Sequence, residues 1–430
     1  MSPWIPVLSE SPDMKTAAWK SIEAISSELL QQRYLSDHLQ RKHYVYEEAL
    51  LYGYLYCANL SGQWDLHCIE RLNMAIDGSS ELDLSLYGGL CGLGWTIEHI
   101  SRLLLNSGYS QRSNEEHDLN EDIDVTILKQ LENEPGVYPY DLISGLVGFG
   151  VYFLERLPHP LAQKGLALII EQISEAAECN DAGATWLTAP QFLPSWQRSE
   201  FPFGHYDLGV AHGVPGILYL LCEIMRRGFK KERTLDLLEK GVRWLHSQAR
   251  ADGARSLFPP WTSPVPGSYQ ARPVWCYGDL GIAAVLLQVA RYTDRSDWRS
   301  LARDLIQHCL DLAPEQYLVR DAGLCHGSSG IAHMFNRFYH MENNPRYRAA
   351  ALFWFQRTLD FCQSGSGFGG YSRFTTENSS KNTNWEPSPG FLDGAIGIAL
   401  SLLGAVTSVE PKWDRLLLLS GSSQWVPEPQ

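Results

Sequence analysis

The 430-residue sequence contains no run of about 18 uncharged apolar residues, so we expect no segment to span a membrane. It also lacks a cluster of lysine and arginine, and its formal net charge of −14 disfavours binding to nucleic-acid phosphates or to an anionic lipid surface. The first residues have neither the basic segment nor the apolar core of a secretory signal peptide. The nine cysteines are scattered and odd in number, unlike the framework of an exported disulfide-rich domain. We therefore expect a cytoplasmic protein with no transmembrane segment and no nucleic-acid partner.

A repeated Gly-x-x-Gly unit organises the chain. Six units, each followed by an apolar stretch, begin at Gly89, Gly145, Gly213, Gly278, Gly327 and Gly394. A seventh, degenerate unit lies at residues 50–53. The first glycines follow one another at intervals of 49 to 68 residues, which is long enough for two helices and their connections.

The two helices of each repeat are expected to differ in burial. Residues that follow the glycines are apolar nearly all round, which predicts helices buried on every side. The intervening segments carry narrow apolar stripes at helical spacing, as in Trp298, Leu301, Leu305, Cys309 and Leu312, and these predict outer helices. About seven such pairs that curve back on themselves would form an all-α fold, an α/α toroid with a double ring of inner and outer helices.

The same pattern suggests the limits of the domain. Residues 45–410 are expected to form the toroid, after an N-terminal helical lead-in at 1–44 and before a C-terminal tail at 411–430. Two segments near 182–207 and 253–275 are rich in proline and aromatic residues and predict irregular insertions. They would either cover the mouth of the toroid or form a small extension. The polar run at 375–384 predicts a solvated loop.

The positions just before the glycines suggest a site. Counted back from the first glycine, position −2 holds Cys276 and Cys325 in consecutive repeats, and position −1 holds His212, Tyr277 and His326. Equivalent positions of a closed ring converge on its axis, so we expect these side chains to meet. Two thiolates and one imidazole suit Zn²⁺ with its fourth position open, which is the ligand count of a catalytic site. Helix N-termini that point at the same cavity would favour bound anions.

Each of these residues also has a structural interpretation when it is taken alone. A single cysteine before a glycine is usually a small buried apolar residue. Asp393, at position −1 of the last unit, is typical of a helix N-cap. The shared register of Cys276 and Cys325 favours zinc, because unrelated core cysteines would not coincide in the repeat.

Three motifs in this order resemble the lanthionine synthetase C-like family, and most closely the stand-alone cyclases of bacterial (class I) lanthipeptide biosynthesis. The motifs are Ala211-His212-Gly213, Trp275-Cys276-Tyr277-Gly278 and Cys325-His326-Gly327, and the resemblance spans about residues 45 to 405. It implies zinc ligands at Cys276, Cys325 and His326. It also implies a catalytic histidine at His212, an acidic partner at Asp141 and an arginine at Arg272.

The resemblance implies an intramolecular Michael addition. In that reaction a cysteine thiol of a precursor peptide attacks dehydroalanine or dehydrobutyrine and closes a lanthionine or methyllanthionine thioether ring. His212 would act as general acid, as general base or as both, oriented by Asp141. Arg272 would pair with enolate charge or fix Asp141, and Tyr277 would either assist or only line the cavity. The expected partners are a dehydrated precursor peptide with its leader and a lanthipeptide dehydratase.

Three other functions remain open from the sequence. The first is addition of a free thiol such as glutathione to dehydrated residues of damaged proteins. The second is another α/α-toroid enzyme, either a prenyltransferase or a glycosidase; the 14 tryptophans would suit sugars, but no paired carboxylates stand in the repeat register. The third is a non-catalytic scaffold that binds a peptide or a dehydratase.

Overall fold

The computed structural model describes residues 3–31, 44–60, 62–107, 118–250, 254–263, 269–375 and 385–421. Parts of the predicted lead-in (1–2 and 32–43), second insertion (253 and 264–268), polar loop (376–384) and tail (422–430) lie outside these described residues. The chain divides into two compact units. The first is made of Met1–Leu82, His99–Arg112 and Leu318–Trp413, and the second of Asp83–Glu98, Ser113–Tyr317 and Asp414–Gln430. Within the described ranges, no helix combines the length and apolar character that crossing a membrane requires.

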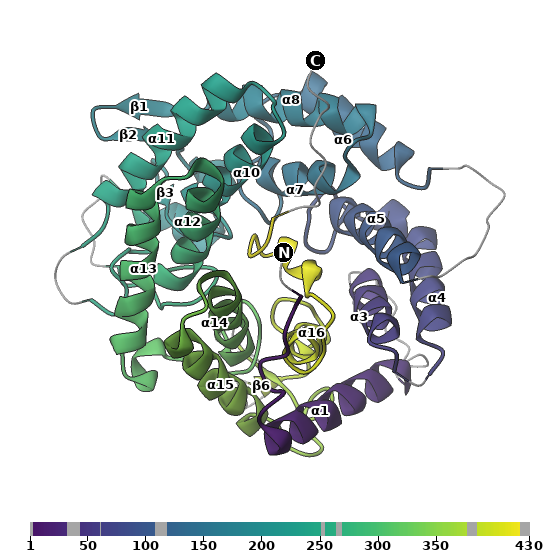
Figure 1. Cartoon of the computed structure of the whole chain (residues 1–430). Helices are drawn as coiled ribbons and strands as arrows, with labels where there is room; N and C mark the ends of the chain where they lie inside the picture. Colours follow the sequence, from purple (N-terminus) through teal and green to yellow (C-terminus); the bar gives the residue numbers. More distant parts are fainter. Residues whose placement is uncertain are drawn as a thin grey trace. The chain divides into compact units, whose positions relative to one another are not determined.

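The first unit contains three pairs of packed helices (Figure 1). The pairs are α3 (Val45–Cys57) with α4 (Trp64–Asp77), α14 (Ser328–Glu342) with α15 (Pro345–Asp360), and α16 (Ala395–Val406) with α1 (Pro12–Gln31). Helix α16 also contacts α3 and α14, so these three helices share one core. The unit further holds the end of α5 (Leu90–Asn106), the 3-10 helix η2 (Ser79–Glu81) and the antiparallel strands β5 (Arg373–Phe374) and β6 (Trp385–Glu386).

The second unit follows the same plan with more irregular structure. Its helix pairs are α7 (Leu146–Arg156) with α8 (Pro160–Glu175), α10 (Val214–Arg226) with α11 (Lys231–Ser247), and α12 (Asp279–Thr293) with α13 (Ser296–Asp311). Helix α6 (Glu121–Asn133) packs on α8, and α10 contacts both α7 and α12. Short elements complete the unit: β1 (Glu178–Asn180), β2 (Gly183–Thr185), η3 (Pro190–Phe192), α9 (Ser195–Glu200), β3 (Tyr206–Asp207), β4 (Trp261–Thr262) and η4 (Pro314–Tyr317). Helix η5 (Lys412–Arg415) crosses from one unit to the other.

Burial separates the two kinds of helix as the sequence predicts. Every residue of α7 and α16 is buried, as are residues 214–225 of α10 and 279–290 of α12. By contrast, α11 and α13 bury one stripe each; in α13 that stripe includes Trp298, Leu305 and Cys309. The helices that follow the glycines are therefore the core helices of their units, and their partners face water on one side.

Loops before the buried helices fold back onto the first helical turn. The N–H groups of residues 146, 147 and 148 donate to carbonyl oxygens seven residues earlier, and those of residues 328, 329 and 330 do the same. These are the N–H groups that have no partner inside a helix. The loop can approach this closely only beside glycine, because a Cβ on Gly330 would overlap the carbonyl oxygen of Leu324. At the starts of α7 and α14 these N–H groups are therefore already bonded, and an anion placed there would interact only with the field of the helix terminus.

A buried ion cluster joins three helices of the second unit. The guanidinium of Arg156 lies 2.6 Å from Oδ2 of Asp124, 2.8 Å from Oε2 of Glu98 and 2.5 Å from Oδ2 of Asp118. Asp124 is fully buried and also accepts a hydrogen bond from the hydroxyl of Tyr152 at 2.6 Å. Burial alone would raise the pKa of Asp118, but its hydrogen bond from Arg156 holds that pKa below its usual value. Arg156 thus neutralises carboxylates that tie α5 and α6 to α7.

Replacing Arg156 with alanine is expected to lower the free energy of unfolding by about 3–5 kcal/mol, because it leaves the buried Asp124 carboxylate without its guanidinium partner. Arg295→Ala is the control, since Arg295 pairs with Asp297 and Glu239 at the surface, where such pairs contribute up to about 1 kcal/mol. Urea denaturation followed by tryptophan fluorescence measures both variants. Equal losses for the two arginines would show that the buried cluster adds nothing to stability.

Candidate active site and metal ligands

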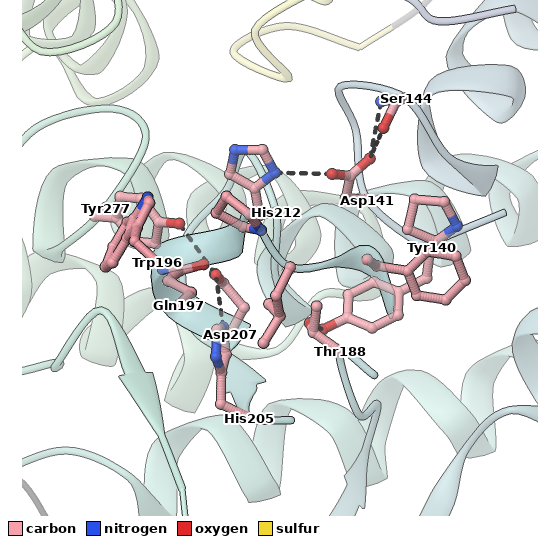
Figure 2. Close-up of a pocket in the computed structure, with 14 residues that line it drawn as sticks. Tyr140, Asp141, Ser144, Thr188, Trp196, Gln197, His205, Asp207, His212 and Tyr277 are labelled. Atoms are coloured by element: carbon pink, nitrogen blue, oxygen red, sulfur yellow. Dashed lines mark hydrogen bonds and ion pairs between the residues drawn. The ribbon is translucent and has the colours of Figure 1, made fainter. Parts of the chain in front are cut away.

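A hydrogen bond joins His212 to Asp141. Nδ1 of His212 lies 2.8 Å from Oδ2 of Asp141, and Figure 2 shows the two side chains facing each other. An ionised carboxylate can only accept a hydrogen bond, so Nδ1 carries the proton and donates it. The other ring nitrogen, Nε2, is then left to exchange a proton with a ligand. It can do so because the imidazole side chain is 42% exposed.

The loops that carry this pair are fixed to each other by further hydrogen bonds. Oδ1 of Asp141 accepts the N–H of Ser144 at 2.8 Å, which closes the turn before α7. The N–H of Leu142 donates to the carbonyl oxygen of Ala211 at 3.1 Å. Residues 71 positions apart in the chain are therefore brought together by the backbone as well as by their side chains.

The surroundings of His212 favour its protonated form. Burial of the ring lowers its pKa, but the hydrogen bond and charge of Asp141 oppose this effect, and the charges of Asp207 and Cys276 add to the opposition. The net result is a pKa raised above the usual 6.5. A histidine tuned in this direction is a ready proton donor near neutral pH.

Tyr277 forms another wall of the same site. Its ring lies roughly parallel to that of His212, with centroids 6.3 Å apart. Its hydroxyl donates to Oδ2 of Asp207 at 3.1 Å, and His205 Nε2 lies 3.6 Å from the same oxygen. Since its proton is engaged by Asp207, the Tyr277 oxygen faces other groups as an acceptor.

Sequence reasoning missed Asp207. It stands six residues before Gly213, where Asp83 and Asp321 stand before the corresponding glycines of two other repeats. All three carboxylates accept a backbone N–H two residues further on, at 2.9, 2.8 and 3.1 Å for Asp83, Asp207 and Asp321. The recurrence was a readable signal for a loop-capping aspartate, but it did not reveal the additional bond from Tyr277.

Arg272 occupies the same register position in the repeat that begins at Gly278. It is half-buried, and its carbonyl oxygen accepts the N–H of Val274 at 2.8 Å. Among the described residues, the cavity that holds His212, Asp141 and Tyr277 does not count Arg272 in its lining. The second unit thus brings His212, Asp141 and Tyr277 together and leaves Arg272 outside their cavity.

Cys276 lies in the same unit, in the turn before α12. Its side chain is largely buried, and its charge is one of those that act on His212. The turn depends on Gly278, which has a φ of +94° and whose added Cβ would overlap the carbonyl oxygen of Arg272. Glycine is the residue that adopts this conformation without strain, so it sets the path of the chain past Cys276.

Cys325 and His326 belong to the first unit, in the turn before α14. Both are half-buried. The N–H of Cys325 donates to the carbonyl oxygen of Leu392 at 2.9 Å. Asp321 fixes the start of the turn, since its two carboxylate oxygens accept the N–H groups of Gly323 at 3.1 Å and Phe374 at 3.0 Å.

The chemistry of these donors fits zinc. Cys276, Cys325 and His326 supply two thiols and one imidazole, a donor set that could hold a metal ion. None of the nine cysteines is in a disulfide bond, so both sulfurs are available in the reduced form. Thiolate and imidazole are the preferred donors of Zn²⁺, and three protein ligands leave one position for a substrate. Asp118, Asp124 and His159 form another candidate group, but there the Arg156 guanidinium already supplies the positive charge.

Comparison with known proteins places these residues in a family. The sequence model of the family described as lanthionine synthetase C-like protein matches residues 49–418 of this chain. This chain belongs to that family. It is 21% identical over 280 residues to the nisin biosynthesis protein NisC of Lactococcus lactis subsp. lactis; the match covers 61% of this chain and 64% of that protein, which is slightly less than two thirds of its length.

The solved structure of nisin cyclase has the same fold. It superimposes with a TM-score of 0.67 at 20% sequence identity and covers 87% of this chain and 90% of the other. The likeness confirms the predicted all-α fold class, the α/α toroid of the lanthionine synthetase C-like family.

Proposed function

We propose that this protein is a zinc-dependent lanthipeptide cyclase. It adds cysteine thiols of a precursor peptide to dehydroalanine or dehydrobutyrine and forms lanthionine or methyllanthionine rings. The observation that carries the proposal is the Asp141–His212 pair at 2.8 Å, in the unit that also contains Cys276. Family membership and the Cys-Cys-His donor set support an enzyme of this kind.

Cys276, Cys325 and His326 would hold the metal. Bound Zn²⁺ supplies a positive charge that keeps a substrate thiol deprotonated at neutral pH, where a free thiol with a pKa near 8.5 is only a few per cent ionised. Two cysteine ligands would leave such a site electron-rich, which would suit a substrate thiolate that must remain nucleophilic.

His212 would move the protons of the reaction. Its Nε2 takes the proton of the incoming thiol, while Nδ1 stays bonded to Asp141. The sulfur then bonds to the β-carbon of the dehydrated residue, and the electron pair of the double bond passes to the α-carbon and the adjacent carbonyl as an enolate. The same Nε2 returns a proton to the α-carbon, so protons and charge balance over the cycle. Asp141 holds the ring in place and stabilises its charged form.

The remaining site residues have supporting roles in the proposal. Tyr277, held by Asp207, keeps the His212 ring against one wall of the cavity. Arg272 stabilises enolate charge when the substrate is bound, or fixes the loop that carries Cys276 through its backbone.

The proposal extends to the surroundings of the enzyme. The peptide would arrive with its leader from a lanthipeptide dehydratase in the cytoplasm, a compartment in which cysteines stay reduced. Residues 45–410 would form the cyclase domain, with a lead-in at 1–44, irregular insertions near 182–207 and 253–275, and a tail at 411–430.

A thiol count tests the proposal. Purified protein mixed with a dehydrated peptide that contains one cysteine is expected to remove one free thiol per peptide without a change of mass. Treatment with a strong chelator should stop the reaction, and added Zn²⁺ should restore it. A mass gain of one glutathione in the presence of that thiol would instead indicate an intermolecular transferase. Unchanged thiols with bound peptide would indicate a scaffold.

A further inference from the structure

A cavity of about 320 Å³ lies beside the Asp141–His212 pair in the second unit. Asp141, His212 and Tyr277 line it, and so do Phe192, Leu193 and Trp196 of the segment that forms η3 and α9. Its volume is at the lower end of the range for small-ligand sites, roughly 300–1,000 Å³, so it suits one or two side chains better than a folded peptide. The proposed reaction uses Asp141, His212 and Tyr277 and leaves the three apolar residues without a role.

The segment that carries the three apolar residues is held in a defined structure by hydrogen bonds. Residues 190–200 form η3 and α9, and Arg198 binds this segment together by donating to the carbonyl oxygens of Pro190 and Leu193, both at 3.0 Å. The segment is anchored at its base by paired backbone hydrogen bonds between Thr188 and His205, at 2.8 and 3.2 Å. The Tyr140 hydroxyl and the Thr188 hydroxyl are also 2.6 Å apart. The wall therefore exists before a ligand binds, which limits the ordering cost of binding.

Trp196 stands out on this wall because it is 60% exposed although it is large and apolar. An indole left in water beside a cavity gains free energy when an apolar group covers it. Two carboxylates, Asp141 and Asp207, also line the cavity, and its lining in the described part of the chain includes no lysine or arginine. The cavity therefore favours an apolar or aromatic group and disfavours an anion.

The identity of that group follows from the position of His212. Resting on the proposed function, His212 must reach the α-carbon of the dehydrated residue. Successive Cα atoms are about 3.8 Å apart, so the neighbours of that residue in the peptide lie next to His212 and its cavity. We propose that the wall of Phe192, Leu193 and Trp196 is a specificity pocket for an apolar or aromatic side chain of a residue adjoining the dehydrated residue of the peptide.

Binding can be measured without the reaction. The probe is a short peptide in which alanine replaces the dehydrated residue and serine replaces the cysteine. The residue on each side of the alanine is varied in turn among leucine, phenylalanine, glycine and aspartate. Calorimetry on the intact protein is expected to show leucine or phenylalanine bound roughly tenfold more tightly than glycine at one of the two positions, and aspartate bound more weakly than glycine.

Three variants test whether the preference for an apolar side chain depends on the wall of Phe192, Leu193 and Trp196. Trp196→Ala is expected to bring the leucine and phenylalanine peptides to the affinity of the glycine peptide, whereas Trp196→Phe keeps most of the preference. Phe203→Ala is the matched control, because Phe203 is a large apolar residue just after α9 that is 76% exposed and does not belong to the cavity lining among the described residues. Both substituted side chains are exposed, so the variants are expected to fold.

The outcomes separate this pocket from the proposed reaction. Equal affinities for all four residues at both positions in the wild type, or a preference unchanged in Trp196→Ala, would overturn the pocket. If dehydrated peptides are cyclised at equal kcat/KM whatever the neighbouring residue, the reaction stands and the pocket fails. If the binding preference is present and no dehydrated peptide is cyclised, the pocket stands and the proposed reaction fails.

Discussion

Cys276→Ala is expected to lose bound zinc and to lower the rate of ring closure by at least about 10³-fold. Without the metal, the substrate thiol at pH 7 is roughly 3% ionised, which alone costs about 30-fold. Loss of the position that the metal gives to the sulfur adds a factor on the order of 10². Metal analysis of the purified variant and a count of free peptide thiols over time measure the two effects.

Cys179→Ala is the matched control for this experiment, because Cys179 is exposed, lies in the strand pair β1–β2 and stands outside the repeat register. It is expected to keep both zinc and activity. Cys276→Ala with a full complement of zinc and unchanged ring closure would remove the metal site from the proposal. The Asp141–His212 pair would then have to account for the chemistry by itself.

His212→Ala is expected to keep its zinc and to lower kcat by about 10²–10⁴-fold, which is the usual contribution of a positioned acid or base. The reason is that the imidazole is the group placed to exchange protons, while no proposed metal ligand is changed. Stopped or quenched assays at saturating peptide, with metal analysis on the same samples, measure the split. His246→Ala is the control, since His246 is an exposed histidine of α11. Loss of zinc in His212→Ala would instead make His212 part of the metal site.

The pH dependence of Asp141→Asn gives this assignment a second readout. Burial lowers the pKa of His212 and Asp141 raises it to a net value above 6.5, so removing the carboxylate charge should lower that pKa. In the proposed cycle Nε2 of His212 must be unprotonated to take the thiol proton, so activity rises as pH rises through the pKa of His212, and this acid limb of the profile moves to lower pH in Asp141→Asn. The double variant with His212→Ala should be no slower than His212→Ala alone, because Asp141 acts through the ring. An unmoved limb would contradict this link.

The helical repeats could be predicted from the sequence because the amino-acid composition of each helix reflects how far it is buried. Residues 395–406 contain no charged side chain, and all of them are buried in α16. The stripe in α13 was equally legible, since Trp298, Leu305 and Cys309 recur at helical spacing. The glycines predicted close backbone approach, and at Gly330 the structure shows which carbonyl comes near. Local pattern was sufficient for these elements.

The candidate site was only partly readable. The register of Cys276 and Cys325 pointed to shared chemistry, but the partnership of Asp141 with His212 came from the family resemblance. Nothing in the spacing of those two residues shows that the N–H of Leu142 would bond to the carbonyl oxygen of Ala211. Such a bond depends on how α7 and α10 pack, which is a property of the whole unit.

The segment at 182–207 was the least predictable part. Its prolines predicted irregular structure, and the order that it has comes from contacts that no periodicity encodes. These include the guanidinium of Arg198 on two carbonyl oxygens and the pairing of Thr188 with His205. Asp207 was missed for a related reason, since its hydroxyl partner on Tyr277 lies 70 residues further along the chain.

Main-chain bonding at the helix starts has an evolutionary consequence. Because the turns before α7 and α14 are held by carbonyl oxygens and glycines, the side chain that precedes the first glycine is not needed to form the turn. That place is filled by His212, Tyr277, His326 and Asp393 in successive repeats, which are residues of three different types. Side chains of different chemistry can therefore occupy this position without a change in the helices that follow.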